Sequence, residues 1–273
     1  MKLIIINVGV FALYHFIHLF FFLFAATDHF MLDKWLAAPS DLNDLAHRPW
    51  TLITYMFFHE DFFHLLFNML CLYWFGRIFC LYFRSSSLIN VYLLGGIFGV
   101  VSFIAAFNIF PAFTVKLPIL GASASVLAIV LGISLYVPKY TLNMLFIGPV
   151  KLIYIAAFIV FFDIVSISMS NNAGGHIAHL GGALFGYLFT ANYRKGKDIT
   201  IWLDKFFGWC GGLLKPKPKM KIKYKKPPVD DWEYNKQKKN DQAEVDRILD
   251  KISIGGYDCL TKTEKETLFS QKK

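Results

Sequence analysis

The chain has 273 residues, is 56% hydrophobic with a mean hydropathy of +0.47, and carries a formal net charge of +9 at pH 7. A membrane-spanning helix needs about 20 mostly apolar residues, so this composition has room for several and indicates a polytopic membrane protein rather than a soluble one. Residues 1–193 hold 8 basic and 7 acidic residues, whereas residues 194–273 hold 20 and 12. Nearly all of the positive charge therefore lies in the tail.

Six apolar segments in the first ~195 residues are predicted to be helical membrane spans. They cover about residues 4–24, 62–83, 87–108, 120–137, 146–169 and 176–192. The first is too long for the hydrophobic region of a signal peptide and lacks a small-x-small cleavage site, so we expect it to be retained. The fourth and sixth have only 17 or 18 residues, so one end of each should lie below the membrane surface, beside a wet cavity.

Basic residues in the short loops define the expected orientation, because loops on the inner side of a membrane carry an excess of Lys and Arg. Loops that contain Lys2, Arg77 and Arg84, Lys139 and Lys151 alternate with loops that carry Asp and Glu. Both ends of the chain are therefore predicted to lie inside, and the fourth and sixth spans both begin at the outer side. An inward-facing tail fits a bacterial inner membrane, with an organellar membrane as the alternative.

The tail after the sixth span is predicted to have three parts. Residues 194–214 should form an interfacial amphipathic helix, since their large apolar residues fall at helical spacing. Residues 215–240 are predicted to be a basic linker and residues 241–273 a small helical tail, broken at Gly255 and Gly256. Basic runs would suit nucleic acid, but directly after a last span they favour anionic lipid, so no nucleic-acid partner is expected.

Ser123 is the first of two residues that look able to do covalent chemistry. It begins the fourth helix, whose first turn offers unpaired backbone N–H groups and the positive end of a dipole to a developing oxyanion. Gly121 before it allows close backbone approach. Helix packing is the alternative explanation, because small residues recur every four positions at Ala124, Ala128 and Gly132.

His179, near the start of the sixth span, is the second. Gly182 and Gly186 follow it on the same side of the helix, so this side can approach the stripe of small residues in the fourth span. Such packing would bring His179 toward Ser123, where a neutral imidazole could accept the serine proton. His176, one turn earlier, competes for the role, and the position of the glycines favours His179.

Three further polar residues lie in apolar spans. His64 and Asn68 share one face of the second span and could donate hydrogen bonds to an oxyanion. Alternatively, they could form hydrogen bonds between helices, each of which stabilises a membrane protein by under about 1 kcal/mol. Asp163, in the fifth span, would cost ~2.5–3.5 kcal/mol if unpaired at mid-membrane. A proton or ion pathway is one interpretation of Asp163, and a structural hydrogen bond to a neighbouring helix is the favoured one.

Three motifs, in order along the chain, resemble those of the rhomboid family of intramembrane serine proteases. They are HLLFN at residues 64–68, GAS at 121–123 and AHLGGALFG at 178–186. The resemblance covers about residues 45–193 and includes RPW at 48–50, in an outer loop that looks like the family's loop lying partly in the membrane.

The resemblance implies an all-helical polytopic membrane protein, a six-transmembrane-helix rhomboid-like bundle with a basic cytosolic tail. By the resemblance, Ser123 would be the nucleophile and His179 the base of a dyad, with His64, Asn68 and the Ser123 backbone amide forming the oxyanion hole. Neither a cofactor nor a metal is implied. No third, acidic member of the dyad is expected.

The chain departs from the family's pattern at two positions near the motifs. Ala124 stands where a second glycine is frequent, and Leu127 stands where an aromatic residue often lies under the histidine. Neither change removes a reacting atom, but each can alter the orientation of the histidine and the rate.

The sequence therefore predicts a serine endopeptidase that cleaves transmembrane segments of membrane proteins. A substrate helix must unwind locally before its carbonyl can react, because helical backbone is internally hydrogen-bonded. A non-catalytic rhomboid-like protein that binds membrane clients is the alternative, although such relatives typically lack the serine or the histidine. A transporter is less favoured, since no inverted repeat of broken helices is evident.

Overall fold

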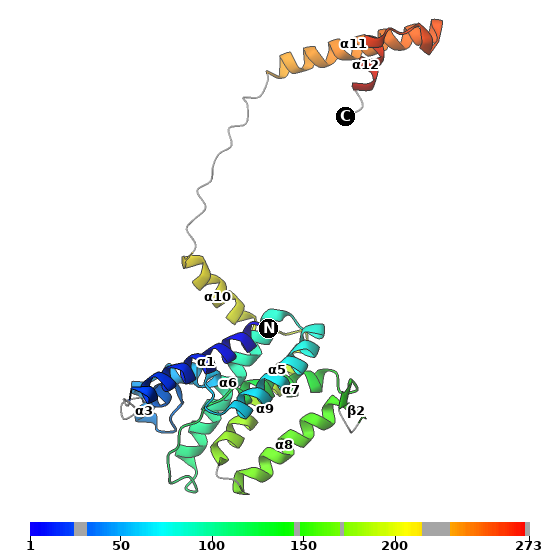
Figure 1. Ribbon diagram of the computed structural model, residues 1–273. Coiled ribbons are helices and arrows are strands. Elements are labelled where there is room, and N and C mark those ends of the chain that lie inside the picture. The colour runs from blue at the N-terminus through cyan, green and yellow to red at the C-terminus, as the bar shows by residue number, and fades with distance from the viewer. Residues whose placement is uncertain (25–31, 145–147, 170–171, 215–229, 271–273) are drawn as a thin grey trace. The chain divides into compact units, whose positions relative to one another are not determined.

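The computed structural model of the chain describes residues 1–24, 32–144, 148–169, 172–214 and 230–270. The chain divides into two compact units, Met1–Lys215 and Pro216–Lys273. The longer helices of the first unit are α1 (Lys2–Leu23), α5 (Phe62–Tyr82), α6 (Ser85–Ile109), α7 (Ser123–Tyr136), α8 (Leu152–Met169) and α9 (Ala173–Tyr193) (Figure 1). It also contains the short helices α2 (Leu32–Leu36), α3 (Leu42–His47) and α4 (Thr51–Thr54), the 3-10 turn η2 (Tyr55–Phe57) and helix α10 (Ile201–Leu214).

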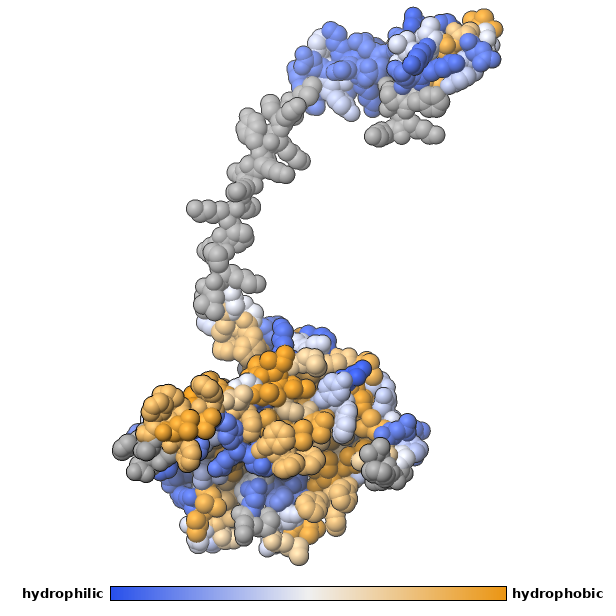
Figure 2. Space-filling view, viewed as in Figure 1, coloured by the Kyte–Doolittle hydropathy of each residue, from blue (hydrophilic) through white to orange (hydrophobic). Residues whose placement is uncertain are grey.

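Four helices in the described part of the chain, α1, α5, α6 and α8, are long and apolar enough to cross a membrane. Helix α7 has 14 residues and is shorter, and α9 is not in this group. Figure 2 shows hydrophobic residues over much of the visible face of the first unit. Phe16, Phe67 and Phe158 are among the large exposed side chains of this unit. The chain is thus a mostly helical multi-pass membrane protein, and the number of six spans stays a prediction.

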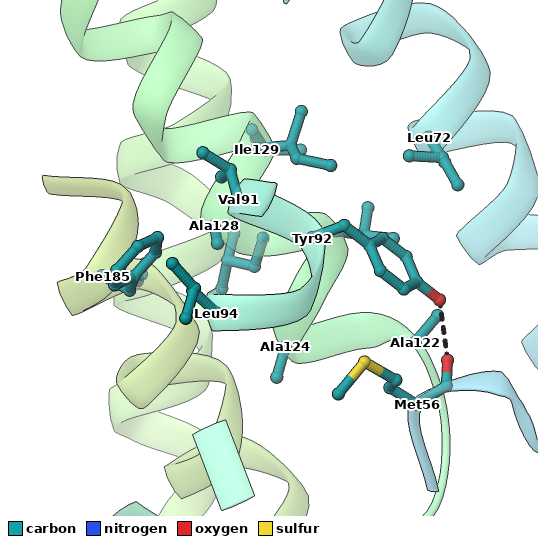
Figure 3. Close-up of a cluster of buried hydrophobic side chains, with 14 of the residues drawn as sticks. Met56, Leu72, Val91, Tyr92, Leu94, Ala122, Ala124, Ala128, Ile129 and Phe185 are labelled. Carbon is teal, nitrogen blue, oxygen red and sulfur yellow. Dashed lines mark hydrogen bonds between the residues drawn. The ribbon is translucent and has the colours of Figure 1, made fainter. Parts of the chain in front are cut away.

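Helix α7 lies at the centre of the bundle, where it contacts α5, α6, α8 and α9. Ten of its 14 residues are buried, and most of these are small or β-branched. Figure 3 shows one cluster of buried side chains that contains Ala124, Ala128 and Ile129 of α7, together with Leu94 of α6 and Phe185 of α9. The small side chains let neighbouring backbones come close, which is how helices associate without a hydrophobic driving force.

Two tyrosine hydroxyls attach the segment before α5 to the core. Tyr92 of α6 donates to the carbonyl of Met56 at 2.7 Å, the bond drawn in Figure 3, and Tyr55 donates to the carbonyl of Gly96 at 2.6 Å. An isolated bridge pairs Ala38 with Ile119, so the loop before α7 is held as well. These contacts fix the two loops that precede α5 and α7.

Polar residues connect α10 to the start of α6. Arg84 lies 2.7 Å from Asp198 and 3.2 Å from Asp204, and Asn90 donates to Asp204 at 2.7 Å. Asp198 also accepts from Ser87 at 3.2 Å. The acidic residues of this segment therefore face α6, while Trp202 and Phe206 are exposed. The location of this helix at a membrane surface stays a prediction.

The fifth predicted span is wrong at its beginning. Residues 148–151 form strand β2 (Gly148–Lys151), which pairs antiparallel with β1 (Thr141–Met144), and α8 begins only at Leu152. Residues 145–147 lie outside the described residues. Gly148 has φ +85, a conformation that fits the turn of a hairpin and not the interior of a right-handed helix, and proline at 149 suits a strand edge better than a helix interior.

The second unit contains α11 (Asp231–Gly255), the 3-10 turn η3 (Tyr257–Cys259) and α12 (Lys262–Ser270). The expected linker over 215–240 is therefore wrong for its last ten residues, and 215–229 lie outside the described part of the chain. Helix α11 begins where Asp230 accepts a hydrogen bond from the N–H of Trp232, with acidic residues in its first turn. Capping and dipole effects at this end override the lack of apolar periodicity.

Candidate active site

Ser123 is held at the first position of α7 by two hydrogen bonds that backbone N–H groups of the preceding loop donate. The N–H of Gly121 donates to the carbonyl of Tyr55 at 2.9 Å, and the N–H of Ala122 donates to Nε2 of His59 at 3.2 Å. Gly121 has φ +114, a conformation that L side chains rarely adopt. The chain therefore turns sharply into the helix and presents the first-turn N–H groups, which have no partner within the helix, beside Ser123.

His59, which the sequence analysis did not single out, is a structural part of this loop. Its side chain is fully buried. Burial first, and then the charge of nearby His64, lower the pKa of His59 to about 4. The ring is therefore neutral at pH 7, and its Nε2 is free to accept the Ala122 N–H.

The glycines of α9 bring that helix against α7, backbone to backbone. A Cβ on Gly182 would lie 2.1 Å from the carbonyl oxygen of Ala124, and one on Gly186 would lie 2.3 Å from that of Ala128. Any side chain at either position would force the helices apart. Because Ala124 follows Ser123 directly, this approach sets the distance between the serine and the helix that carries His179.

Ser123 and His179 line one cavity of about 640 Å³. His64 of α5 lines it as well, and so do Glu60 and Asp61 in the loop before that helix. No hydrogen bond joins Ser123 Oγ to His179 among the described residues, as is common in enzymes without substrate. The cavity therefore brings together one serine and two histidines from three helices.

His64 and Asn68, the two predicted side-chain donors, lie at different distances from the cavity. The ring of His64 lies against Gly121, since a Cβ there would be 2.8 Å from His64 Nε2. Asn68 is buried one turn further along α5, is not among the residues that line the cavity, and donates to the carbonyl of His64 at 2.9 Å. Of the two predicted side-chain donors, only His64 is at the cavity wall.

An acidic residue lies beside the histidine, and it makes the hydrogen bond to a neighbouring helix that was favoured for Asp163. Oδ1 of Asp163 lies 2.8 Å from Nδ1 of His179 and 2.7 Å from Nδ1 of His176. Asp163 is 3% exposed. It lies in the second half of α8, and the histidines lie in the first two turns of α9, so the three residues are at a similar depth. The sequence contains this matching depth, but it does not show that α8 and α9 are neighbours.

The same three side chains are the one group of this kind in the described residues that could hold a metal ion. The donor atoms of Asp163, His176 and His179 all lie within 4.8 Å of one another. Two imidazoles and a carboxylate are ligands that Zn²⁺ accepts. A metal here would compete with the hydrogen bonds that the three residues make to one another.

The site thus combines a half-buried serine at a helix start, a histidine on the facing helix and a cavity that both residues line. The comparisons agree on the family: the model of the rhomboid domain matches residues 46–196, and the chain belongs to the rhomboid family. It is 30% identical over 206 residues to RHOMBOID-like protein 12, mitochondrial, of Arabidopsis thaliana. The match covers 71% of this chain and 58% of that protein. A family of unknown function, DUF6576, matches residues 229–272.

Proposed function

We propose that this protein is an intramembrane serine endopeptidase in which Ser123 is the nucleophile and His179 the general base. The observation that carries the proposal is that both residues line one cavity, at a site where α7 and α9 approach at Ala124 and Gly182. The family contains serine proteases, and both candidate reacting residues are present in this chain.

The chemistry follows from the positions of the polar groups. The Oγ of Ser123 attacks the scissile carbonyl while its proton passes to the ring nitrogen of His179 that does not face Asp163. The carbonyl electrons move to oxygen, and the N–H of Ser123 and the ring of His64 stabilise this oxyanion. Asn68 can join them only if its second amide hydrogen reaches the cavity. His179 then protonates the leaving amine, the C–N bond breaks, and water hydrolyses the acyl-enzyme.

The substrate in this proposal is a transmembrane segment of another membrane protein, and the surrounding fold is a six-span bundle with both ends inside. A helical segment has its carbonyls bonded internally, so a cleavable one must unwind near the cavity. Helix-weakening residues and small side chains would favour this step. The basic tail is proposed to lie on anionic lipid, in a bacterial inner membrane or an organellar one.

Labelling by a fluorophosphonate, which reacts with activated serines, tests the proposal in purified, detergent-solubilised protein. We expect wild type and Ser125→Ala to be labelled, and Ser123→Ala and His179→Ala to lose labelling. Ser125 is a matched control because it is two residues away, fully buried, and points at the sulfur of Met56. If folded wild type reacts with none of several such probes, the client-binding alternative is the better account.

A further inference from the structure

Asp163 is an acidic residue in the second half of α8, a helix that is otherwise uncharged. It is flanked by exposed aromatic residues, Phe161 and Phe162, yet its own side chain is buried against α9. A charge at this depth is costly and is normally retained for a reason. The contacts that offset its cost are the hydrogen bonds to His176 and His179.

The geometry of these bonds determines where the proton of each ring lies. Both Nδ1 atoms contact the same oxygen, Oδ1, at 2.7 and 2.8 Å. A carboxylate oxygen can only accept, so each imidazole donates from Nδ1. In the neutral form of His179, Nε2 is then the unprotonated nitrogen, and His179 is the histidine of the two that lines the cavity with Ser123.

We propose that Asp163 is the positioning residue of the active site and that it completes a Ser123–His179–Asp163 triad. The inference rests on the proposed function and deepens it. Asp163 holds His179 in the tautomer that can accept the serine proton at Nε2. When that proton arrives, the carboxylate stabilises the imidazolium, and it keeps the ring oriented while the proton passes to the leaving amine. Asp163 itself takes up no proton.

His176 has a supporting role in this arrangement. It donates to the same oxygen from one turn earlier in α9, so it limits the movement of the Asp163 carboxylate. It does not line the cavity that contains Ser123. Removal of His176 should therefore change the rate much less than removal of Asp163.

A purely structural tie between α8 and α9 is the competing explanation. Such a tie would hold α8 against α9, because much of α8 is exposed and an apolar groove of about 550 Å³ lies along it. Ile164 and Leu180 are among the residues that line this groove. A tie needs only a hydrogen bond, whereas a positioning residue needs a charged acceptor on the correct nitrogen. The isosteric variant Asp163→Asn separates the two, because an amide can keep a hydrogen bond while losing the charge and the choice of tautomer.

The experiment measures the fluorophosphonate labelling rate of Ser123 in the detergent-solubilised full chain between pH 5 and 9. Asp163→Asn should be at least ~100-fold slower, since an Asp to Asn change at the matching place of a serine protease triad lowers kcat by about 10⁴ with geometry retained. Its thermal stability should stay near that of wild type. The acid side of its rate profile should move to lower pH, because the imidazolium has lost its carboxylate. His176→Gln should remain within about tenfold of wild type.

Several results would overturn the proposal. Labelling of Asp163→Asn within about threefold of wild type, with an unchanged pH profile, would leave only the structural tie. If that variant fails to fold, ¹⁵N NMR spectra of wild type show which ring nitrogen of His179 carries the proton. A proton on Nε2 would refute the triad. Loss of labelling on adding a chelator, restored by Zn²⁺, would make the three residues a metal site instead. Absence of labelling in wild type would refute the proposed function itself, which no result on Asp163 could do.

Discussion

The Cα of Gly182 lies so close to the carbonyl oxygen of Ala124 that a Cβ on the glycine would be 2.1 Å from that oxygen. Real Cβ atoms do not approach backbone this closely, so α7 and α9 can hold their present spacing only with glycine at 182. Since Ser123 precedes Ala124 and His179 is three residues before Gly182, this contact controls the geometry of the candidate dyad.

Gly182→Ala should therefore destabilise the protein and slow the labelling of Ser123. Overpacking in a tight core costs about 1–3 kcal/mol, and helix displacement separates Ser123 from His179. Gly132→Ala is the matched control, because its Cβ would meet the carbonyl of Gly186 at an ordinary 3.6 Å. That change should be neutral or stabilise by up to about 1 kcal/mol, since alanine is the better helix former. Equal losses of melting temperature in both variants would contradict the explanation.

Gly121→Ala should damage the site in two ways, by backbone strain at a positive φ and by a clash with His64. A second glycine, Gly148, shows the effect of the strain alone. Gly121 has φ +114, and a Cβ there would lie 2.6 Å from Cε1 of His64. Gly148 also has a positive φ, +85, but nothing lies within 4 Å of its Cβ position. Gly148→Ala should therefore cost only backbone strain of about 1–2 kcal/mol and leave labelling intact. Gly121→Ala should cost more and reduce labelling; thermal melts and labelling rates of the two variants check this.

The stability of the protein should fall as the pH is lowered from about 6.5 toward 4, partly because of His59. Burial and the charge of His64 lower the pKa of His59 to about 4 in the folded protein. The unfolded chain, with the ordinary pKa near 6.5, therefore binds the proton first, and each unit of pH in that window costs up to about 1.4 kcal/mol. Protonation also removes the acceptor for the N–H of Ala122.

His59→Gln provides the test, since glutamine does not titrate. The difference in melting temperature between wild type and variant should shrink steadily from pH 7 to pH 4. A difference that stays constant over this range would show that His59 does not titrate there. His47→Gln, at an exposed position in α3, should leave the pH dependence of wild type unchanged.

Much of the bundle and part of the site could be predicted because both rest on local patterns. The glycines at 182 and 186 and the small residues at 124 and 128 have helical spacing, and the structure places these two sets in contact. The partnership of Asp163 with His179 depends on which helices are neighbours, and no spacing within one helix contains that information. The hairpin before α8 was missed because its apolar residues are equally compatible with a span.

The tail offers a prediction that is independent of catalysis. Thr261 and Glu264 form a capping box at the start of α12: the N–H of Thr261 donates to Glu264 at 2.8 Å, and the N–H of Glu264 donates back to Thr261 Oγ1 at 3.4 Å. Lys251 of α11 also lies 2.9 Å from Glu264. The backbone bond from Thr261 and the Lys251 ammonium lower the pKa of Glu264 to about 2.

Glu264→Gln should therefore loosen α12 without changing the labelling of Ser123. In wild type, the contribution of Glu264 is complete above its ordinary pKa near 4.5 and is lost as the pH falls toward 2, so low pH should mimic the variant. Amide hydrogen exchange of residues 262–268 in the full chain measures both effects. Glu233→Gln is the matched control, since Glu233 is exposed on α11, makes no ion pair among the described residues and should leave exchange in α12 unchanged. Faster exchange in both variants alike would show that net charge, rather than the capping box, stabilises this helix.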